Sequence, residues 1–261
     1  MDLGLRDHVV VITGGSSGIG RATAVELARQ GAHLVVGARH KEALDVLAEE
    51  FADIGAEHVT VPGDLCTVQG VEALVDAARL RWGRVDGLVA SVGSTPVGDF
   101  DELNDDTWQT AFTGKFLASV RAIRAVLPDM RARGSGRIVV VAGNTANASR
   151  SWMATSGAMN SALVNLAAST AQHLAKDGIG INCLSPGPTA TTRYGGMLAT
   201  VMRRQELTEA EAAESIRAEI PAGRIADPEE VARIAVVLVS PQSAHINGTN
   251  IVIDGAQTSQ A

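Results

Sequence analysis

The sequence predicts an α/β protein with a single Rossmann-like domain: a doubly wound sheet of about seven parallel strands, with helices on both faces. Short runs rich in valine and isoleucine alternate with amphipathic helical patterns along all 261 residues, and no linker interrupts them. A glycine-rich loop directly follows the first apolar run and leads into a helical pattern. Hydrophobic residues make up 46% of the chain, enough for one sizeable core. We therefore expect one domain over residues 1–261, with right-handed crossovers and a ligand crevice at the carboxyl ends of the strands.

The first strand and the loop after it, residues 8–20, read His-Val-Val-Val-Ile-Thr-Gly-Gly-Ser-Ser-Gly-Ile-Gly. A strand, a glycine-rich turn and a helix start in this order make a seat for nucleotide phosphates, because the helix N-terminus offers free N–H groups and a partial positive charge. The glycines permit a tight turn and a close approach of backbone to a diphosphate, and the serines add hydroxyl donors. The predicted phosphate contacts are Gly14, Ser16, Ser17, Ile19 and Gly20.

The remaining elements follow from the same periodicities. Strands are expected at residues 31–39, 58–62, 85–91, 136–142, 178–185 and 250–253. Helices are expected at 41–56, 67–83, 152–176 and after a cap at Asp227, together with a long helical region over 103–132 that breaks near Gly114. Residues 189–220 lack strand character, and we interpret them as a mobile, partly helical lid over the substrate.

Bulk composition excludes several classes of function. The formal net charge is −7 and the basic residues are scattered, so neither nucleic acid nor an acidic membrane is an expected partner. No apolar run reaches the length of a membrane span and the first residues lack a signal pattern, so we expect a soluble, cytoplasmic protein. Cys66 and Cys183 have neither disulfide nor metal-site spacing. We expect both to be buried, reduced thiols, and we expect no bound metal.

Motifs spread over the whole chain resemble those of the short-chain dehydrogenase/reductase family. Residues 13–20 have its spacing Thr-Gly-x-x-x-Gly-x-Gly, and residues 86–93 stand where the family has Asp-x-Leu-Val-Asn-Asn-Ala-Gly. Asp64-Leu65 after the third strand, Asn182-Cys-Leu-Ser-Pro-Gly-Pro188 and residues 246–255 match further segments. The resemblance implies a nicotinamide cofactor and a small-molecule substrate. The further cofactor contacts that it implies are Asp64, Leu65, Ser91, Gly93, Pro186, Gly187 and Thr189.

The end of the second strand indicates which cofactor is bound. A carboxylate there binds the 2′-hydroxyl of the adenosine ribose in NAD(H), whereas an arginine suits the 2′-phosphate of NADP(H). This chain has Ala38 in the place of the acid, followed by Arg39 and His40, and no acidic residue occurs between 31 and 41. The sequence therefore favours NADP(H) over NAD(H), with Arg39 and His40 as contacts. The alternative is a solvated arginine at the start of the next helix.

The proton-transfer residues of the family are missing from the positions where the resemblance places them. Members carry a serine after the fifth strand, a Tyr-x-x-x-Lys pair on the next helix, and an asparagine on the helix after the fourth strand. When the motifs are aligned, this chain has Gly143 in place of the serine and Ser156 in place of the tyrosine. It has Asn160 in place of the lysine and Lys115 in place of the asparagine. A register shift of one residue, or the enoyl-reductase spacing Tyr-x-x-Met-x-x-x-Lys, supplies no tyrosine or lysine either. We therefore interpret the chain as an atypical member that lacks the Ser/Tyr/Lys catalytic residues.

The catalytic candidates are Lys115, Asn144, Ser156 and Asn160. A serine hydroxyl without a cation beside it is a poor acid at neutral pH, because it titrates far above a phenol. A lysine in the crevice would lose hydration, which lowers its pKa and lets it act as a base, an acid or an anion clamp. Alternatively, Lys115 lies on a helix surface or is a structural cation paired with carbonyls. Asn144 belongs to a polar loop that can hydrogen-bond a ligand, and Tyr194, the only tyrosine, lies in the lid as a replacement acid or a packing residue.

Three functions fit these residues. The first is an NADP(H)-dependent oxidoreductase of a small carbonyl, alcohol or enone, with Lys115, water or the substrate handling the proton. The second is a non-redox isomerase, dehydratase or lyase with Lys115 as base, and the third is a non-catalytic NADP(H)-binding protein. The resemblance also implies a homodimer or homotetramer. Small apolar residues in the helix at 161–175 agree with a close pairing of helices.

Overall fold

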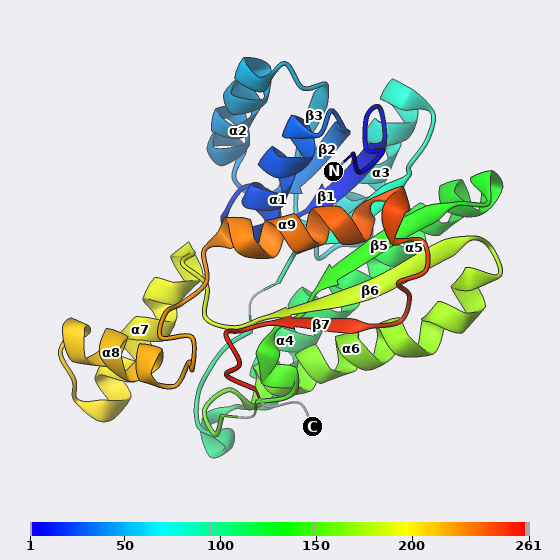
Figure 1. The fold of residues 1–261 in the computed structure, drawn as a ribbon. Helices are drawn as coiled ribbons and strands as arrows, with labels where there is room; N and C mark the ends of the chain where they lie inside the picture. The colour runs from blue at the N-terminus through cyan, green and yellow to red at the C-terminus, as the bar shows by residue number, and fades with distance from the viewer. Residues whose placement is uncertain (1, 94, 149, 259–261) are drawn as a thin grey trace.

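A seven-stranded sheet forms the centre of the molecule, which is described here by a computed structural model covering residues 2–93, 95–148 and 150–258. Every pair of neighbouring strands is parallel, and the order across the sheet is β3-β2-β1-β4-β5-β6-β7 (Figure 1). The strands are β1 (Val9–Thr13), β2 (His33–Ala38), β3 (His58–Pro62), β4 (Gly87–Ala90), β5 (Gly136–Val141), β6 (Ile179–Pro186) and β7 (Asn250–Ile253). The predicted fold class and the number of strands are confirmed.

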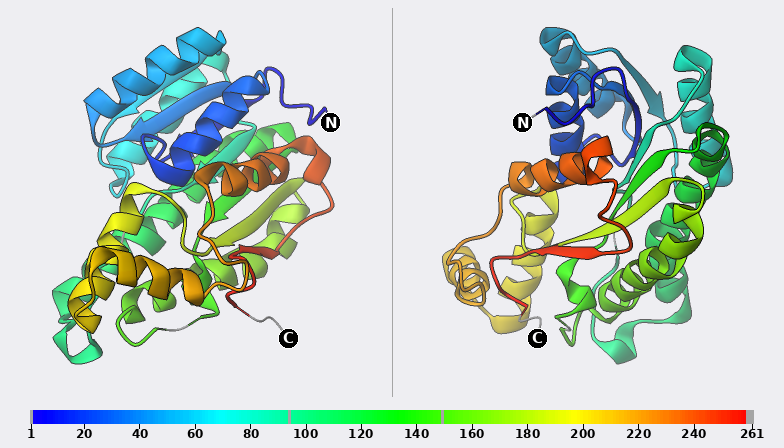
Figure 2. Two further views of the ribbon diagram at one scale, coloured as in Figure 1. Left: turned by 60° about the vertical axis from the view of Figure 1, so that its left-hand side comes forward. Right: turned by 45° about the vertical axis from the view of Figure 1, so that its right-hand side comes forward.

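Helices connect the strands and cover both faces of the sheet (Figure 2). The α-helices are α1 (Gly18–Arg29), α2 (Lys41–Ile54), α3 (Val68–Trp82), α4 (Asp105–Ala111), α5 (Ala118–Arg133), α6 (Ala154–Ala175), α7 (Thr192–Gln205), α8 (Glu209–Ala218) and α9 (Pro228–Val239). Shorter turns are the 3₁₀ segments η1 (Phe100–Glu102), η3 (Asn144–Ala146) and η4 (Pro241–Ser243), and the π-helical η2 (Phe112–Leu117). Within the described residues, none of these helices combines the length and apolarity that crossing a bilayer requires.

The central strands are apolar on both sides because each face of the sheet has its own core. Val9 and Val11 of β1 pack into a cluster with residues of α3, α5 and α6, whereas Val10 and Ile12 pack with α1, α2 and α9. Successive side chains of a strand point to opposite faces, so a parallel strand covered on both sides needs an unbroken apolar run. This requirement explains the four consecutive apolar residues before the glycine loop.

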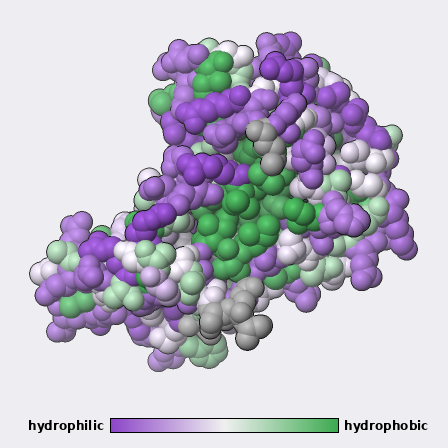
Figure 3. All heavy atoms as spheres, viewed as in Figure 1, coloured by the Kyte–Doolittle hydropathy of each residue, from purple (hydrophilic) through white to green (hydrophobic). Residues whose placement is uncertain are grey.

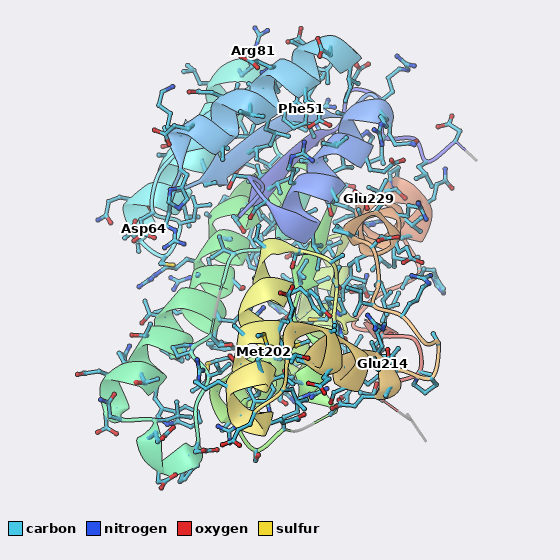
Figure 4. The ribbon with its side chains drawn as sticks, turned by 90° about the vertical axis from the view of Figure 1, so that its left-hand side faces the viewer. Phe51, Asp64, Arg81, Met202, Glu214 and Glu229 are labelled. Carbon is cyan, nitrogen blue, oxygen red and sulfur yellow. The ribbon has the colours of Figure 1, made fainter. Side chains whose placement is uncertain are left out.

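The strand order reverses at β1, which pairs with β2 on one side and β4 on the other. Ligands of doubly wound sheets bind beside such a reversal, where the strands end. We call this side of the sheet, with the segments that directly follow β1 to β6, the carboxyl edge. Figure 4 looks toward it, with α7 crossing in front and Asp64 at its rim.

Two expectations about local structure were wrong in detail, and a third was confirmed. The helical region after β4 does not break at Gly114, because α4 continues into α5 through the π-helical turn η2. The helical character predicted for residues 189–220 is confirmed, since α7 and α8 lie there and pack together around their own apolar cluster. Cys183 is buried as expected, but Cys66 is only half-buried because it lies in the turn between β3 and α3.

The surface is mostly hydrophilic, with one clear apolar area in the view of Figure 3, where β7 and α9 lie in Figure 1. All four residues of β7 are half-buried, and Ile251 and Ile253 pack partly against the core. A strand at the edge of a sheet leaves one row of backbone groups unpaired. The apolar area therefore lies between β7 and α9, next to the edge of the sheet.

A pair of matched substitutions tests the packing of the core. Phe51 of α2 is fully buried, whereas Leu80 of α3 is 92% exposed. F51A leaves a cavity, so we expect it to lower the free energy of unfolding by about 3–5 kcal/mol. L80A is expected to change it by less than about 0.5 kcal/mol. Urea denaturation followed by circular dichroism measures both, and similar effects of the two variants would contradict the described packing.

Candidate active site

The glycine loop between β1 and α1 folds back on itself and against the end of β4. A Cβ on Gly20 would lie 2.3 Å from the carbonyl oxygen of Gly14. A Cβ on Gly14, whose φ is +72°, would lie 2.9 Å from the carbonyl oxygen of Ser91. Both approaches are too close for any side chain, so the loop requires glycine at these two positions.

The start of α1 keeps donors available for an anion. Ser17, which precedes the helix, is exposed, and its hydroxyl makes no capping bond to the helix. Ser16 is half-buried, and Ile19 is half-buried against the core on this side of the sheet. Because the first N–H groups of a helix have no intrahelical acceptor, this uncapped end fits the phosphates of a dinucleotide.

The ends of β2 and β3 lie side by side at one end of the carboxyl edge, since Ala38 is paired with Pro62. Arg39 and His40 are exposed there, and Arg39 forms no ion pair within the described ranges. Asp64 is exposed and accepts a hydrogen bond from the backbone N–H of Cys66 at 3.0 Å, while Leu65 is buried. An exposed arginine without a carboxylate partner fits a phosphate ligand.

The segment after β6 brings further predicted contacts to the same edge. Pro186 ends the strand, and the backbone N–H of Gly187 donates to the carbonyl of Ile253 at 2.9 Å. The hydroxyl of buried Thr189 donates to the carbonyl of Gly187 at 2.9 Å. The methyl group of Thr191 lies over the glycine loop, 3.1 Å from where a Cβ of Gly18 would be. The structure therefore places the residues after β1, β4 and β6 together.

Lys115 is buried at the carboxyl edge, only 5% exposed, in the π-helical turn η2. Its Nζ donates to the carbonyl oxygens of Val141 and Ala142, both at 3.1 Å, where β5 ends. Burial, and after it the charge of Arg193, lowers the pKa of Lys115 to about 7, while Cys183 acts in the opposite direction. An ammonium has three N–H donors, so one remains for a ligand. Lys115 is therefore not a surface lysine but a buried amine that changes charge near neutral pH.

Arg193, at the start of α7, reaches the same place from the segment that follows β6. Its Nη1 donates to the carbonyl oxygen of Gly93 at 3.0 Å. Arg193 is exposed by its accessible surface, yet loss of hydration around the guanidinium lowers its pKa. Gly93 also packs on Lys115, because a Cβ there would lie 2.8 Å from Cδ of the lysine. Two cationic side chains thus contact one residue at the end of β4.

Ser156 and Asn160 of α6 belong to a buried hydrogen-bonded cluster with Thr145. The amide nitrogen of Asn160 donates to the Thr145 hydroxyl at 2.7 Å and to the Ser156 hydroxyl at 3.3 Å, and the two hydroxyl oxygens are 3.2 Å apart. Only one hydroxyl can donate to the other, so one O–H stays available. The amide oxygen of Asn160 is buried with no partner among the described residues. The cluster therefore holds one unused O–H donor and one unused acceptor.

Asn144 is directed away from these groups. Its amide nitrogen donates to Gln257 at 2.8 Å and to Asp254 at 3.4 Å, both in the segment that follows β7. A direct contact with substrate stays a prediction for Asn144. Tyr194 packs partly buried against the apolar cluster between α7 and α8, as the packing alternative expects.

Comparisons with known proteins agree with this arrangement. Residues 14–258 match the family model described as enoyl-(acyl carrier protein) reductase. The chain belongs to the short-chain dehydrogenase/reductase family. It is 31% identical to NADPH-dependent reductase BacG of Bacillus subtilis over 249 residues, which cover 94% of this chain and 95% of that protein.

Solved structures of family members extend the likeness to three dimensions. The L-sorbose reductase from Gluconobacter frateurii, complexed with NADPH and L-sorbose, is 31% identical, with a TM-score of 0.93 and full coverage of both chains. A variant of the actinorhodin polyketide ketoreductase with NADPH is 30% identical, with a TM-score of 0.93 over 97% of this chain and 98% of that one.

Sequence reasoning missed Arg193 and the amide oxygen of Asn160. Arg193 lies in a segment that the sequence marks only as helical, beside several other arginines, so no pattern singles it out. The unpartnered oxygen follows from the rotamers of a packed cluster. A basic residue shortly after the segment that matches the end of β6 was the one available signal for Arg193.

The titration of Lys115 can be measured directly, because the chain has only three lysines. Lys41 and Lys176 are exposed, so their signals serve as internal controls. In a protein labelled with carbon-13 at lysine Cε, we expect one signal to titrate near pH 7 and to disappear in K115M. The buried amine must lose its proton there because desolvation disfavours its charge. Three lysine signals that all titrate above pH 10 would contradict this environment.

Proposed function

We propose that this family member is an NADP(H)-dependent oxidoreductase of a small carbonyl or enone, and of the corresponding alcohol, in which Lys115 handles the proton. The observation that carries the proposal is the position of the Lys115 side chain, whose amine is buried where β5 ends and whose Cδ packs on Gly93. Ser156 and Asn160 occupy the two places where the resemblance expects a tyrosine and a lysine. The proposal therefore includes an atypical active site without that pair.

The residues of the glycine loop and its neighbours fit a dinucleotide. The start of α1 with Ser16 and Ser17 would hold the diphosphate, and Arg39 with His40 would hold a 2′-phosphate, which favours NADP(H). The relatives BacG and L-sorbose reductase, described as NADPH-dependent and as complexed with NADPH, support this assignment. When bound, NADPH supplies a hydride and becomes NADP⁺, so a carbonyl substrate needs one proton to become an alcohol.

Lys115 can supply that proton from its third N–H. The carbonyl oxygens of Val141 and Ala142 fix the amine, and its low pKa matches an acid that works at neutral pH. After the transfer the amine is neutral, a state that its burial favours, and it regains a proton from solvent. Ser156, with no charged group among its hydrogen-bond partners, is suited to orient the substrate and not to donate the proton.

The segment 189–220 is proposed as the lid over the substrate. It joins the end of β6 to α9, and its first helix carries Arg193 to the end of β4. We further propose a homodimer or homotetramer, supported by the apolar area at β7 and by half-buried leucines on α5 and α6. The cytoplasmic location stays a prediction.

Replacement of Arg39 tests the choice of cofactor. R39Q removes the charge proposed to hold the 2′-phosphate, so we expect NADPH affinity to fall about 10- to 100-fold while NADH affinity is unchanged. Calorimetric titration measures both. The matched control is R29Q, an exposed arginine at the end of α1, which should bind NADPH as the unaltered protein does. An equal loss for both cofactors, or no binding of either by the unaltered protein, would contradict the assignment.

Replacement of Lys115 tests the proton donor. With a panel of ketones, quinones and enones, we expect NADPH oxidation whose kcat/KM falls as pH rises through about 7, because the ammonium is lost. K115M should lower kcat/KM by about 10²–10⁴ and abolish this dependence on pH. K176M, at the exposed end of α6, is the control. Conversion of a substrate without net oxidation of NADPH would indicate a non-redox enzyme, and binding without any turnover a non-catalytic protein.

A further inference from the structure

Two cationic side chains converge on Gly93 with donors to spare. Lys115 uses two of its three N–H groups on the carbonyls of residues 141 and 142. Arg193 has five N–H donors, and the described residues accept only one of them, at Gly93. The positive charge of Arg193 disfavours the charged form of Lys115, and a negative group bound beside both side chains would offset this repulsion.

Nothing in the described part of the chain supplies that negative group. Neither Lys115 nor Arg193 takes part in an ion pair there. Asp254, the other buried charged residue, is occupied by the backbone N–H and hydroxyl of Thr258 and by Asn144. No carboxylate is among the influences on the pKa of either cation.

We propose that the substrate of this oxidoreductase is an anion, a carbonyl compound that carries a carboxylate, and that Arg193 binds the carboxylate while Lys115 faces the reacting oxygen. The inference rests on the proposed function and names the substrate class of that same site. A guanidinium is suited to this task because its planar donors pair with both oxygens of a carboxylate.

The diphosphate of the cofactor is the competing anion for Arg193, because Thr191, two residues earlier, lies over the glycine loop. Lys115, by contrast, lies too far from that loop to share the same anion. The glycine loop follows β1, whereas Lys115 is fixed at the end of β5, two strands away across β4. Neighbouring strands are about 4.8 Å apart, so this separation is roughly 10 Å. A phosphate seated on the start of α1 is therefore remote from the Lys115 amine.

An anionic substrate would also supply the charge that Lys115 needs. The positive charge of Arg193 favours loss of the lysine proton, and a carboxylate on Arg193 offsets that charge. Lys115 would then hold its proton when an anionic substrate is bound and lose it more readily with a neutral one. Charge on the substrate thus favours the protonated donor at neutral pH.

Lysine NMR tests this without any turnover. The titration of Lys115 is followed through its Cε signal in buffer, in millimolar benzoate, and in millimolar benzamide, which is the uncharged analogue of benzoate. Each series is recorded with and without NADP⁺. We expect benzoate to raise the pKa of Lys115 by about 1 or more and benzamide to leave it unchanged. Lys41 and Lys176 should not respond. Equal effects of benzoate and benzamide, or none from benzoate, would overturn the proposal.

Two variants separate the possible binding places of the anion. R193Q should raise the pKa of Lys115 in plain buffer, because a repelling charge is gone, and should abolish the response to benzoate. R203Q, an exposed arginine near the other end of α7, should behave as the unaltered protein does. If R193Q instead weakens NADP⁺ binding about tenfold and keeps the benzoate response, Arg193 binds the diphosphate and the proposal is wrong.

The two proposals can fail separately. Failure of NADP⁺ to bind contradicts the proposed function alone, because the benzoate experiment without NADP⁺ still measures the effect of an anion on Lys115 and Arg193.

Discussion

A buried ammonium without a carboxylate partner is the constraint on which the site depends. The pKa of Lys115 is lowered from 10.5 to about 7, which corresponds to roughly 5 kcal/mol against the charged form. Between these pH values the unfolded chain holds a proton that the folded chain does not. This lysine therefore reduces stability progressively as pH falls from 10.5 to 7. Titratable groups whose pKa is shifted this far cluster at functional sites, and Lys115 lies beside the residues proposed to bind the cofactor.

The local backbone is arranged around that lysine. The π-helical turn between α4 and α5 carries Lys115, and such wide turns are frequent at functional sites. Gly93 completes the arrangement, because any larger residue would collide with Cδ of the lysine and with the carbonyl of Gly114. The glycine is thus needed both for the end of β4 and for the path of the lysine side chain. The backbone carbonyl of Gly93 also accepts a hydrogen bond from Arg193, which links the start of α7 to this point.

The sequence predicts the fold closely because the fold depends on patterns that extend over many residues. Strand β3 and strand β7 lie at the predicted residues, and the apolar run of β1 identifies a strand buried on both faces. Local geometry that depends on a single turn is harder to predict from the sequence. For example, Gly114 indicates a break in the helix, whereas the chain there forms a π-helical turn. Among site residues, the phosphate loop follows from glycine spacing, and Lys115 follows from its place in the motif order. Arg193 depends on how the lid packs, which no local pattern encodes.

The two halves of the site differ in how strongly they depend on side chains. A dinucleotide site of this kind is built from helix N–H groups and glycine backbone. Relatives that share the whole fold can therefore share this site even where their side chains differ. Proton transfer and substrate recognition depend on the identity of a few side chains, and those can change while the sheet does not. Ser156 and Asn160 form a neutral cluster with Thr145, whereas Lys115 and Arg193 lie on η2 and α7. With positive charge on those two elements and no carboxylate paired with either, the electrostatics of the proposed site favour a substrate that brings its own negative charge.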